Sequence, residues 1–255
     1  MRERNESDEG GLPETVELAW GLRERPGKGP RRTLSLKGIV EAAVAVGAAE
    51  GLDALSMSRV AREAGASTMA LYRYVASKND LLALVLDELL GEPPGPPDPG
   101  TGWREALRDY AMALREVTRR HPWALRIPVT GPPAMPNNVA WMEAGLRRMR
   151  GMGLDAGTRL SVLMQVTGYV RYQSTLIADL ESAYRAAGTS DRQVAIDYGN
   201  LLAALTADDR RFPEIRALLE SKIFAEPGDD TPEDDFAFGL DCLLDGLEAL
   251  VRRGG

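Results

Sequence analysis

Hydroxyl, aromatic and basic side chains gather in one short stretch of the sequence, GASTMALYRYVASKNDLL at residues 65–82. Arginine pairs bidentately with guanine, and threonine hydrogen-bonds a base edge or touches a thymine methyl group. Tyrosine hydroxyls and lysine ammonium groups suit phosphate oxygens. These residue types indicate a surface that contacts double-stranded DNA; the alternative is an ordinary amphipathic surface. The candidate contact residues are Thr68, Met69, Tyr72, Arg73 and Lys78.

A long helix is predicted to precede this stretch. Ile39, Ala43 and Val46 recur at helical spacing, with Ser35 suited to the start of the helix and Gly51 to its end. This helix would provide the support on which shorter helices pack.

Two short helices and a tight turn follow in the pattern. One helix opens at Ser56 or Ser58, and Gly65 breaks it. A second helix spans residues 68–75, with Leu71 and Val75 one turn apart and facing inward. Ser77 and Asp80 have the spacing of a capping box and start a fourth helix. Two short helices joined by a turn beneath a longer one form a helix-turn-helix, whose second helix enters the DNA major groove.

Charge is distributed unevenly along the chain, whose net charge is −7. Residues 28–78 hold eight basic and four acidic side chains, a local charge of +4, so the remainder carries −11. A basic N-terminal segment on an acidic body is typical of a nucleic-acid-binding module joined to another domain. Lys28, Arg31 and Arg32 are candidates to enter the minor groove as an N-terminal arm. A solvated tail is the alternative.

Composition along the chain predicts an all-α fold in four parts. Residues 1–34 form a flexible N-terminal arm, 35–90 the helix-turn-helix domain, 91–100 a Pro/Gly-rich connector, and 101–255 a larger helical domain. The helices at 155–187 and 233–252 carry apolar stripes. Such stripes favour a homodimer built on a four-helix interface, because a monomer would leave them exposed.

The remaining sequence features exclude several classes of protein. A single cysteine, Cys242, and a single histidine, His121, allow neither an internal disulfide nor an ordinary zinc site. No nucleophile, metal or phosphate-loop motif of an enzyme is present, so we expect no catalysis and no cofactor. No apolar run is long enough for a membrane span and the N-terminus lacks a secretion signal, so we expect a cytoplasmic protein. The competing function is an all-α small-molecule carrier or sensor whose N-terminal module does not bind DNA.

The stretch SMSRVAREAGASTMALYRYVASKNDLL, together with Glu50 and Gly51, resembles the DNA-binding domain of TetR-family transcriptional regulators. The resemblance runs in register over residues 35–85 and implies a repressor that binds a palindromic operator as a dimer. It also implies further DNA contacts at the start of the first short helix and in the recognition helix. Those further positions are Met57, Ser58, Ser67, Ala70 and Tyr74.

Residues 120–146, RHPWALRIPVTGPPAMPNNVAWMEAGL, resemble the tetracycline-repressor-type C-terminal domain. This resemblance implies an effector pocket among the helices of the body. Aromatic walls with few polar groups would suit a largely apolar organic molecule, although aromatics at helical spacing also occur as plain core. His121 is expected to cap or pack at a helix junction. The candidate ligand-binding residues are Trp103, Tyr110, Trp123, Trp141, Met142, Met164, Thr167, Tyr172 and Gln173.

Overall fold

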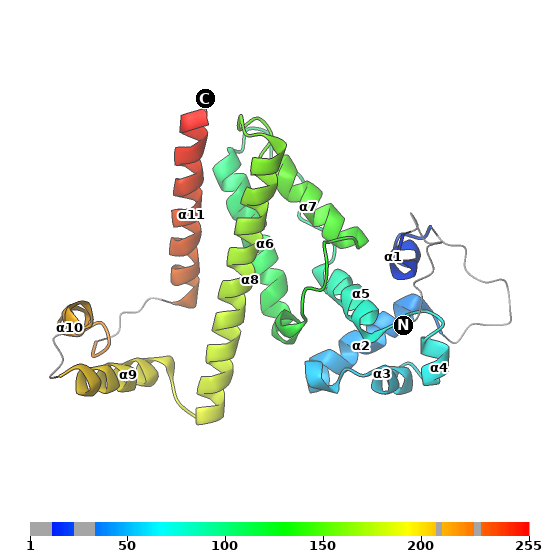
Figure 1. The fold of residues 1–255 in the computed structure, drawn as a ribbon, viewed down its shortest axis with the longest axis horizontal. Coiled ribbons are helices and arrows are strands. Elements are labelled where there is room, and N and C mark those ends of the chain that lie inside the picture. Colours follow the sequence, from blue (N-terminus) through cyan, green and yellow to red (C-terminus); the bar gives the residue numbers. More distant parts are fainter. Residues whose placement is uncertain (1–11, 23–33, 208–210, 227–230, 255) are drawn as a thin grey trace, which may run out of the picture. The chain divides into compact units, whose positions relative to one another are not determined.

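The structure is a computed structural model that describes residues 12–22, 34–207, 211–226 and 231–254. Every regular element in these ranges is a helix and no strand occurs among them (Figure 1). The predicted all-α fold is therefore confirmed. By packing, the chain divides into two compact units, Met1–Arg171 and Tyr172–Gly255. No helix in the described ranges is both long enough and apolar enough to cross a membrane.

A group of helices that follows residue 34 lies together in Figure 1. Its elements are α2 (Leu36–Glu50), η1 (Leu52–Ala54), α3 (Met57–Glu63), α4 (Thr68–Leu71) and α5 (Lys78–Leu90). All four α-helices begin after a serine whose hydroxyl accepts a backbone N–H of the first turn, which satisfies a donor that the helix cannot pair itself. These capping serines are Ser35, Ser56, Ser67 and Ser77.

One apolar core holds this group together. Ile39 and Val46 of α2 are fully buried together with Val60 of α3. Leu71 of α4 and Val75, just beyond α4, belong to the same buried core. The predicted inward orientation of Leu71 and Val75 is confirmed. With those two side chains buried, the neighbouring side chains of the same turn are left to face solvent.

The recognition helix is shorter than the sequence predicts. The pattern suggested a helix over residues 68–75, whereas α4 ends at Leu71 and continues as turns. The reason is visible in the backbone, since the N–H of Arg73 bonds the carbonyl of Ala70 and the N–H of Tyr74 bonds that of Leu71. These contacts span three residues and tighten the last turn into 3-10 geometry.

Part of the predicted flexible arm is an ordered helix. Helix α1 (Glu14–Ala19) buries Thr15 and Val16, and Val16 belongs to the same core as α2 and α5. The indole N–H of Trp20 donates a hydrogen bond of 2.8 Å to the carbonyl of Ala134. The arm predicted over residues 1–34 thus includes one short helix, where a buried valine and an anchored tryptophan hold residues 14–20 on the neighbouring helices.

The rest of the first unit contains α6 (Trp103–Arg120), η2 (Pro122–Arg126), α7 (Pro136–Arg148) and the first half of α8 (Ala156–Ala187). Close packing at Gly145 brings α7 against α8, since a Cβ atom there would lie 2.4 Å from Cδ1 of Leu163. Tyr110 of α6 meets Trp141 of α7 edge to face, with ring centroids 5.4 Å apart. An aromatic pair in this geometry adds about 1 kcal/mol beyond its burial.

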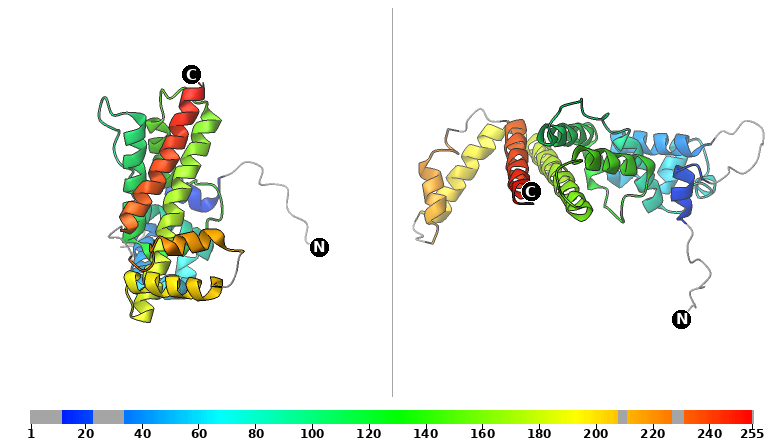
Figure 2. Two further views of the ribbon diagram at one scale, coloured as in Figure 1. Left: turned by 90° about the vertical axis from the view of Figure 1, so that its left-hand side faces the viewer. Right: turned by 90° about the horizontal axis from the view of Figure 1, so that it is seen from above.

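The second unit contains the remainder of α8, α9 (Asp191–Thr206), α10 (Pro213–Glu220) and α11 (Pro232–Gly254). Helices α9 and α10 lie side by side in both Figure 1 and Figure 2. Their contact is closed by Phe224, whose ring meets that of Tyr198 at 5.6 Å and approaches Gly199 closely. The sequence pattern did not predict α9 and α10 as separate helices.

Candidate nucleic-acid interface

The turn between α3 and α4 presents a polar surface next to the buried core. Gly65 adopts a φ of +65°, a left-handed conformation that suits glycine and ends α3 sharply. Beyond this turn Met69 is 74% exposed and Tyr72 and Arg73 are exposed as well, while Thr68 is half-buried. These side chains lie within a single helical turn and its continuation, as required for insertion into one groove.

Positive charge at this surface comes from side chains that no described carboxylate neutralises. Arg59, by contrast, is occupied, with ion pairs of 2.6 Å to Glu50 and 2.8 Å to Glu63. Those hydrogen bonds lower the pKa of Glu50 and raise that of Arg59. Arg73 is exposed without an acidic partner in the described ranges, and so is Lys78 in the first turn of α5. The N-terminal amides of α5 add a partial positive charge beside Lys78.

Several predicted contact residues also have structural roles. Ser67 caps α4 through the N–H of Ala70, and the Tyr74 hydroxyl donates 3.1 Å to the carbonyl of Leu34. Ser58 is exposed at the start of α3, 3.3 Å from the hydroxyl of Ser56, whereas Met57 is buried. Lys28, Arg31 and Arg32 lie outside the described residues.

A buried carboxylate joins α5 to α7. Asp87 of α5 is 8% exposed, and its two oxygens accept the backbone N–H groups of Asn137 at 3.2 Å and Asn138 at 2.8 Å. The side-chain amide of Asn138 also donates to this carboxylate, and that of Asn137 donates to the Asp87 carbonyl. Helix α7 has no capping side chain of its own. Asp87 therefore serves as its N-cap from another helix, where a negative charge is most favourable.

The proline-rich connector is fastened along the same helix. The indole N–H of Trp141 donates to the carbonyl of Gly91 at 2.9 Å, and the guanidinium of Arg148 donates to that of Gly95 at 2.7 Å. Arg148 also lies 5.7 Å from the ring centre of Tyr110, and burial lowers its pKa. Residues 91–95 thus follow α7 by specific hydrogen bonds, which together with Asp87 make a continuous polar seam from α5 to the end of α7.

A second link runs through η2. The guanidinium of Arg171 in α8 donates 2.8 Å hydrogen bonds to the carbonyls of Leu125 and Ile127. Trp123 belongs to η2 as well, and its ring covers Gly47 of α2, where a Cβ atom would lie 2.4 Å from the ring. Only glycine leaves room for this contact between α2 and η2.

We predict that Gly47→Ala destabilises the protein although alanine favours helices by about 1 kcal/mol. The added methyl group collides with Trp123, and overpacking of a well-filled core costs about 1–3 kcal/mol. Thermal unfolding measures the change. Gly168→Ala is the control because that position in α8 is open. Adding Trp123→Leu should restore the helix-favouring effect of alanine; a double variant as unstable as the sum of both changes would contradict the collision.

The candidate ligand-binding residues of the first unit have different surroundings. Tyr110 and Trp141 meet in the core, where burial raises the pKa of Tyr110 to about 12, so its hydroxyl is neutral at pH 7. Trp123 packs on Gly47, and its buried indole N–H has no partner among the described residues. Trp103 is half-buried at the start of α6.

The other candidates from α7 and α8 differ in exposure. Met142 is half-buried and lines a cleft beside α8, whereas Met164 is exposed. The Thr167 hydroxyl donates to the Leu163 carbonyl of its own helix. In the second unit, Tyr172 is exposed and Gln173 half-buried. His121 ends α6 as its C-cap residue, and burial lowers its pKa.

Sequence reasoning missed the residues of the two links. Asp87 lies three residues beyond Leu84, on the apolar side of α5. Because a buried carboxylate needs hydrogen-bond donors, this position was a signal that donors are buried beside it. Arg148 stands likewise among buried α7 residues. Arg171 had no comparable signal, since α8 carries polar residues on several sides.

The fold and this surface define a helix-turn-helix DNA-binding protein with a helical body. Residues 39–85 match the family profile described as bacterial regulatory proteins, tetR family, and residues 96–251 match the tetracyclin repressor-like C-terminal domain. The HTH-type transcriptional repressor DrrR1 of Streptomyces coeruleorubidus is 40% identical over 255 aligned residues, which cover 97% of this chain and 90% of the relative. The chain belongs to the TetR family of transcriptional regulators, which are not enzymes.

Solved structures of ActR from Streptomyces coelicolor are similar over most of the chain. Apo ActR is 26% identical, with a TM-score of 0.73, over 88% of this chain and 100% of ActR. ActR in complex with actinorhodin is also 26% identical, with a TM-score of 0.68, over 86% of this chain and 98% of that chain. The similarity therefore spans the helix-turn-helix and the body alike.

Proposed function

We propose that this regulator is a cytoplasmic homodimer that binds a palindromic operator, represses transcription and is released by a small, largely apolar effector. The observation that carries the proposal is the exposed set at the α3–α4 turn, where Arg73 projects without a described acidic partner beside Thr68 and Tyr72. The relative DrrR1, to which this chain is similar, is a transcriptional repressor. Arg73, Thr68 and Ser58 are the proposed polar readers, and Lys78 a phosphate contact.

Exposed apolar side chains support dimerisation through α8 and α11. Met164 and Phe238 are 65% and 73% exposed, and Leu160, Leu176, Leu180 and Leu250 are exposed as well. Soluble proteins seldom leave so many large apolar groups in water on two helices. Pairing these helices with those of a second copy would form a four-helix interface and set two recognition helices about 34–36 Å apart, one turn of DNA.

The polar seam supplies a route from effector to DNA. An effector that prefers one arrangement of the body changes the balance between two positions of α7, and the Asp87 cap carries that change into α5. Because α5 packs on α2 and α7, a shift of α5 alters the position of the recognition helix. The fastened connector transmits this shift, whereas a free linker of the same length would absorb it.

The effector is proposed to be largely apolar because aromatic residues predominate among the candidates in the body. ActR binds actinorhodin in a solved complex, so actinorhodin is the first compound to titrate against this protein. Trp103, Tyr110, Trp123 and Trp141 remain proposed contacts in a ligand-bound arrangement of the helices, together with Met142, Met164, Thr167, Tyr172 and Gln173.

Selection of genomic DNA fragments by the purified protein tests the proposal. At controlled salt we expect enrichment of one palindromic site with half-sites about one helical turn apart, and a steep fall in affinity as salt rises. Light scattering on the same sample should give the mass of a dimer. Retention of no DNA, or of all fragments alike, would contradict the operator and favour an all-α carrier or sensor.

A further inference from the structure

Helix α1 is too short to be stable by itself. Its six residues, Glu14–Ala19, follow Pro13 and have no side-chain cap at their first turn. Isolated helices shorter than about 12–15 residues are marginal in water, so the surface on which α1 docks must supply its stability. A short segment held only by such docking opens as a unit without unfolding the rest of the protein.

The docking surface of α1 belongs to two parts of the first unit. Val16 is 8% exposed and lies in one buried core with Leu82 of α5 and with Met135, the N-cap residue of α7. Thr15 and Val16 also line a groove whose other sides are α5 and the loop at residues 128–135. Helix α1 thus lies against the DNA-binding domain and against the entrance to α7 (Figure 1).

The loop between η2 and α7 depends on α1 for its attachment. Residues 128–134 are exposed and have no regular structure. Within the described ranges, a single hydrogen bond joins this stretch to the rest of the chain, the 2.8 Å bond that the indole of Trp20 donates to the carbonyl of Ala134. Ala134 lies two residues before α7 begins at Pro136. Undocking of α1 therefore releases the loop immediately before α7.

The groove beside α1 also reaches the cap that joins α5 to α7. Asn138 lines this groove, and its backbone N–H and side-chain amide donate to Asp87 at 2.8 Å and 2.7 Å. The first turn of α7 is thus held at two neighbouring points, by Asp87 through its N–H groups and by α1 through the loop that enters it. A displacement of α5 relative to α7 acts on both points together.

We propose that α1 is an intramolecular strap that couples the DNA-binding domain to the body, because it holds residues 128–135 and the start of α7 against α5. With α1 docked, α5 and the first turn of α7 move together. With α1 undocked, the loop loses its anchor and the coupling weakens. The inference rests on the proposed operator function and adds an element outside the matched family profiles, which cover residues 39–85 and 96–251.

Amide hydrogen exchange of the whole chain, followed by mass spectrometry, tests whether α1 holds the start of α7. Val16→Asp places a carboxylate in an apolar contact and should release α1. Leu12→Asp is the matched control, since it adds the same charge at an exposed position just before the helix. Without DNA, we expect residues 135–142 to exchange about 10-fold faster in Val16→Asp and at the unaltered rate in Leu12→Asp.

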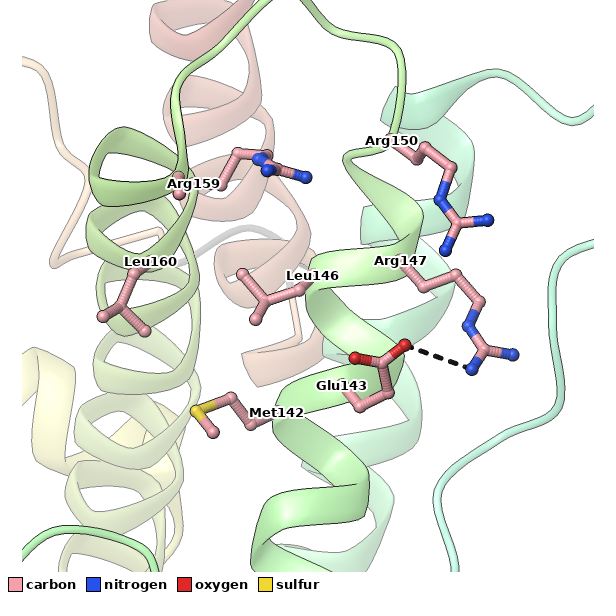
Figure 3. Close-up of a pocket in the computed structure, with 8 residues that line it drawn as sticks. Met142, Glu143, Leu146, Arg147, Arg150, Arg159 and Leu160 are labelled. Carbon is pink, nitrogen blue, oxygen red and sulfur yellow. Dashed lines mark hydrogen bonds and ion pairs between the residues drawn. The ribbon is translucent and has the colours of Figure 1, made fainter.

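Trp20→Phe is a milder variant that keeps an aromatic ring and removes only the N–H donor. It should accelerate exchange of residues 135–142 by about 2–10-fold, the range of one hydrogen bond. Arg147→Gln is its control on α7. This change removes the exposed ion pair of 3.1 Å to Glu143, the dashed line in Figure 3, and should leave the exchange of residues 135–142 unchanged.

The operator fragment obtained by genomic selection tests the coupling, because two coupled sites influence each other reciprocally. At saturating operator we expect slower exchange of residues 135–142 in the unaltered protein and in Leu12→Asp, and a lost operator effect in Val16→Asp. A purely structural α1 would leave the operator effect the same in all three proteins.

The strap is wrong if Val16→Asp and Leu12→Asp exchange alike without DNA. It is also overturned if the operator leaves residues 135–142 of the unaltered protein unchanged, or slows them equally in Val16→Asp. A protein that binds no genomic fragment contradicts the proposed function instead. The comparison without DNA then still decides whether α1 holds the loop.

Discussion

Arg73→Ala is expected to weaken operator binding by about 10–100-fold and to relax sequence preference at one position of each half-site. An arginine that pairs bidentately with guanine contributes about 1–3 kcal/mol of discrimination. Because Arg73 is exposed and makes no described ion pair, its removal should leave folding unchanged. Fluorescence anisotropy with labelled operator and with single-base variants measures both effects.

Lys78→Gln provides the contrast to this variant. Loss of a phosphate contact weakens binding to all sequences about equally and lowers the slope of affinity against salt by about one. Arg185→Ala, at an exposed position near the end of α8, should change neither quantity. If Arg73→Ala keeps the unaltered affinity and base preference, the assignment of α4 and its continuation as the reading element is wrong.

Asp87→Ala is expected to lower the free energy of unfolding by about 2–3 kcal/mol. A hydrogen bond to a charged group contributes about 1.5–3 kcal/mol to stability, and the substitution removes such bonds. The change leaves the first N–H groups of α7 without an acceptor and removes the side-chain link from α5 to α7. For a protein of this size the melting temperature should fall by roughly 4–12 °C. Thermal unfolding and operator affinity are measured together, and we expect the affinity to fall without a change in base preference.

Glu88→Ala is the matched control, since Glu88 is the next carboxylate of α5 and is exposed. Its effect should stay within about 0.5 kcal/mol, as for surface positions in general. Asp87→Asn retains one acceptor oxygen and should fall between the two. An Asp87→Ala variant as stable as Glu88→Ala would show that the cap from α5 contributes nothing to the junction.

Signals that act over a few residues allowed much of the fold to be predicted. Ser35 and Ser77 were recognised as caps, and Gly51 as an end, because each acts on backbone groups within one turn. The orientation of Leu71 and Val75 followed from their spacing. Helix α4 was overestimated because its last turn tightens under tertiary packing, which no local pattern records.

The links between the helix-turn-helix and the body depend on residues far apart in the chain. Asp87 caps a helix that begins 49 residues later, and the ring of Trp123 in η2 packs on Gly47 of α2. Neither contact has a local signature, since both depend on how helices cross. The candidate DNA contacts were easier to identify because they lie close together in one stretch of sequence.

The fastened connector has a consequence for the modularity of this regulator. Proline-rich junctions are common places to exchange domains between related proteins. Here a junction placed after residue 95 would separate Trp141 and Arg148 from the carbonyls they bind. It would also leave Asp87 on one parent and its amide partners on the other. A hybrid that is to keep its response must therefore inherit the helix-turn-helix and α7 from the same parent.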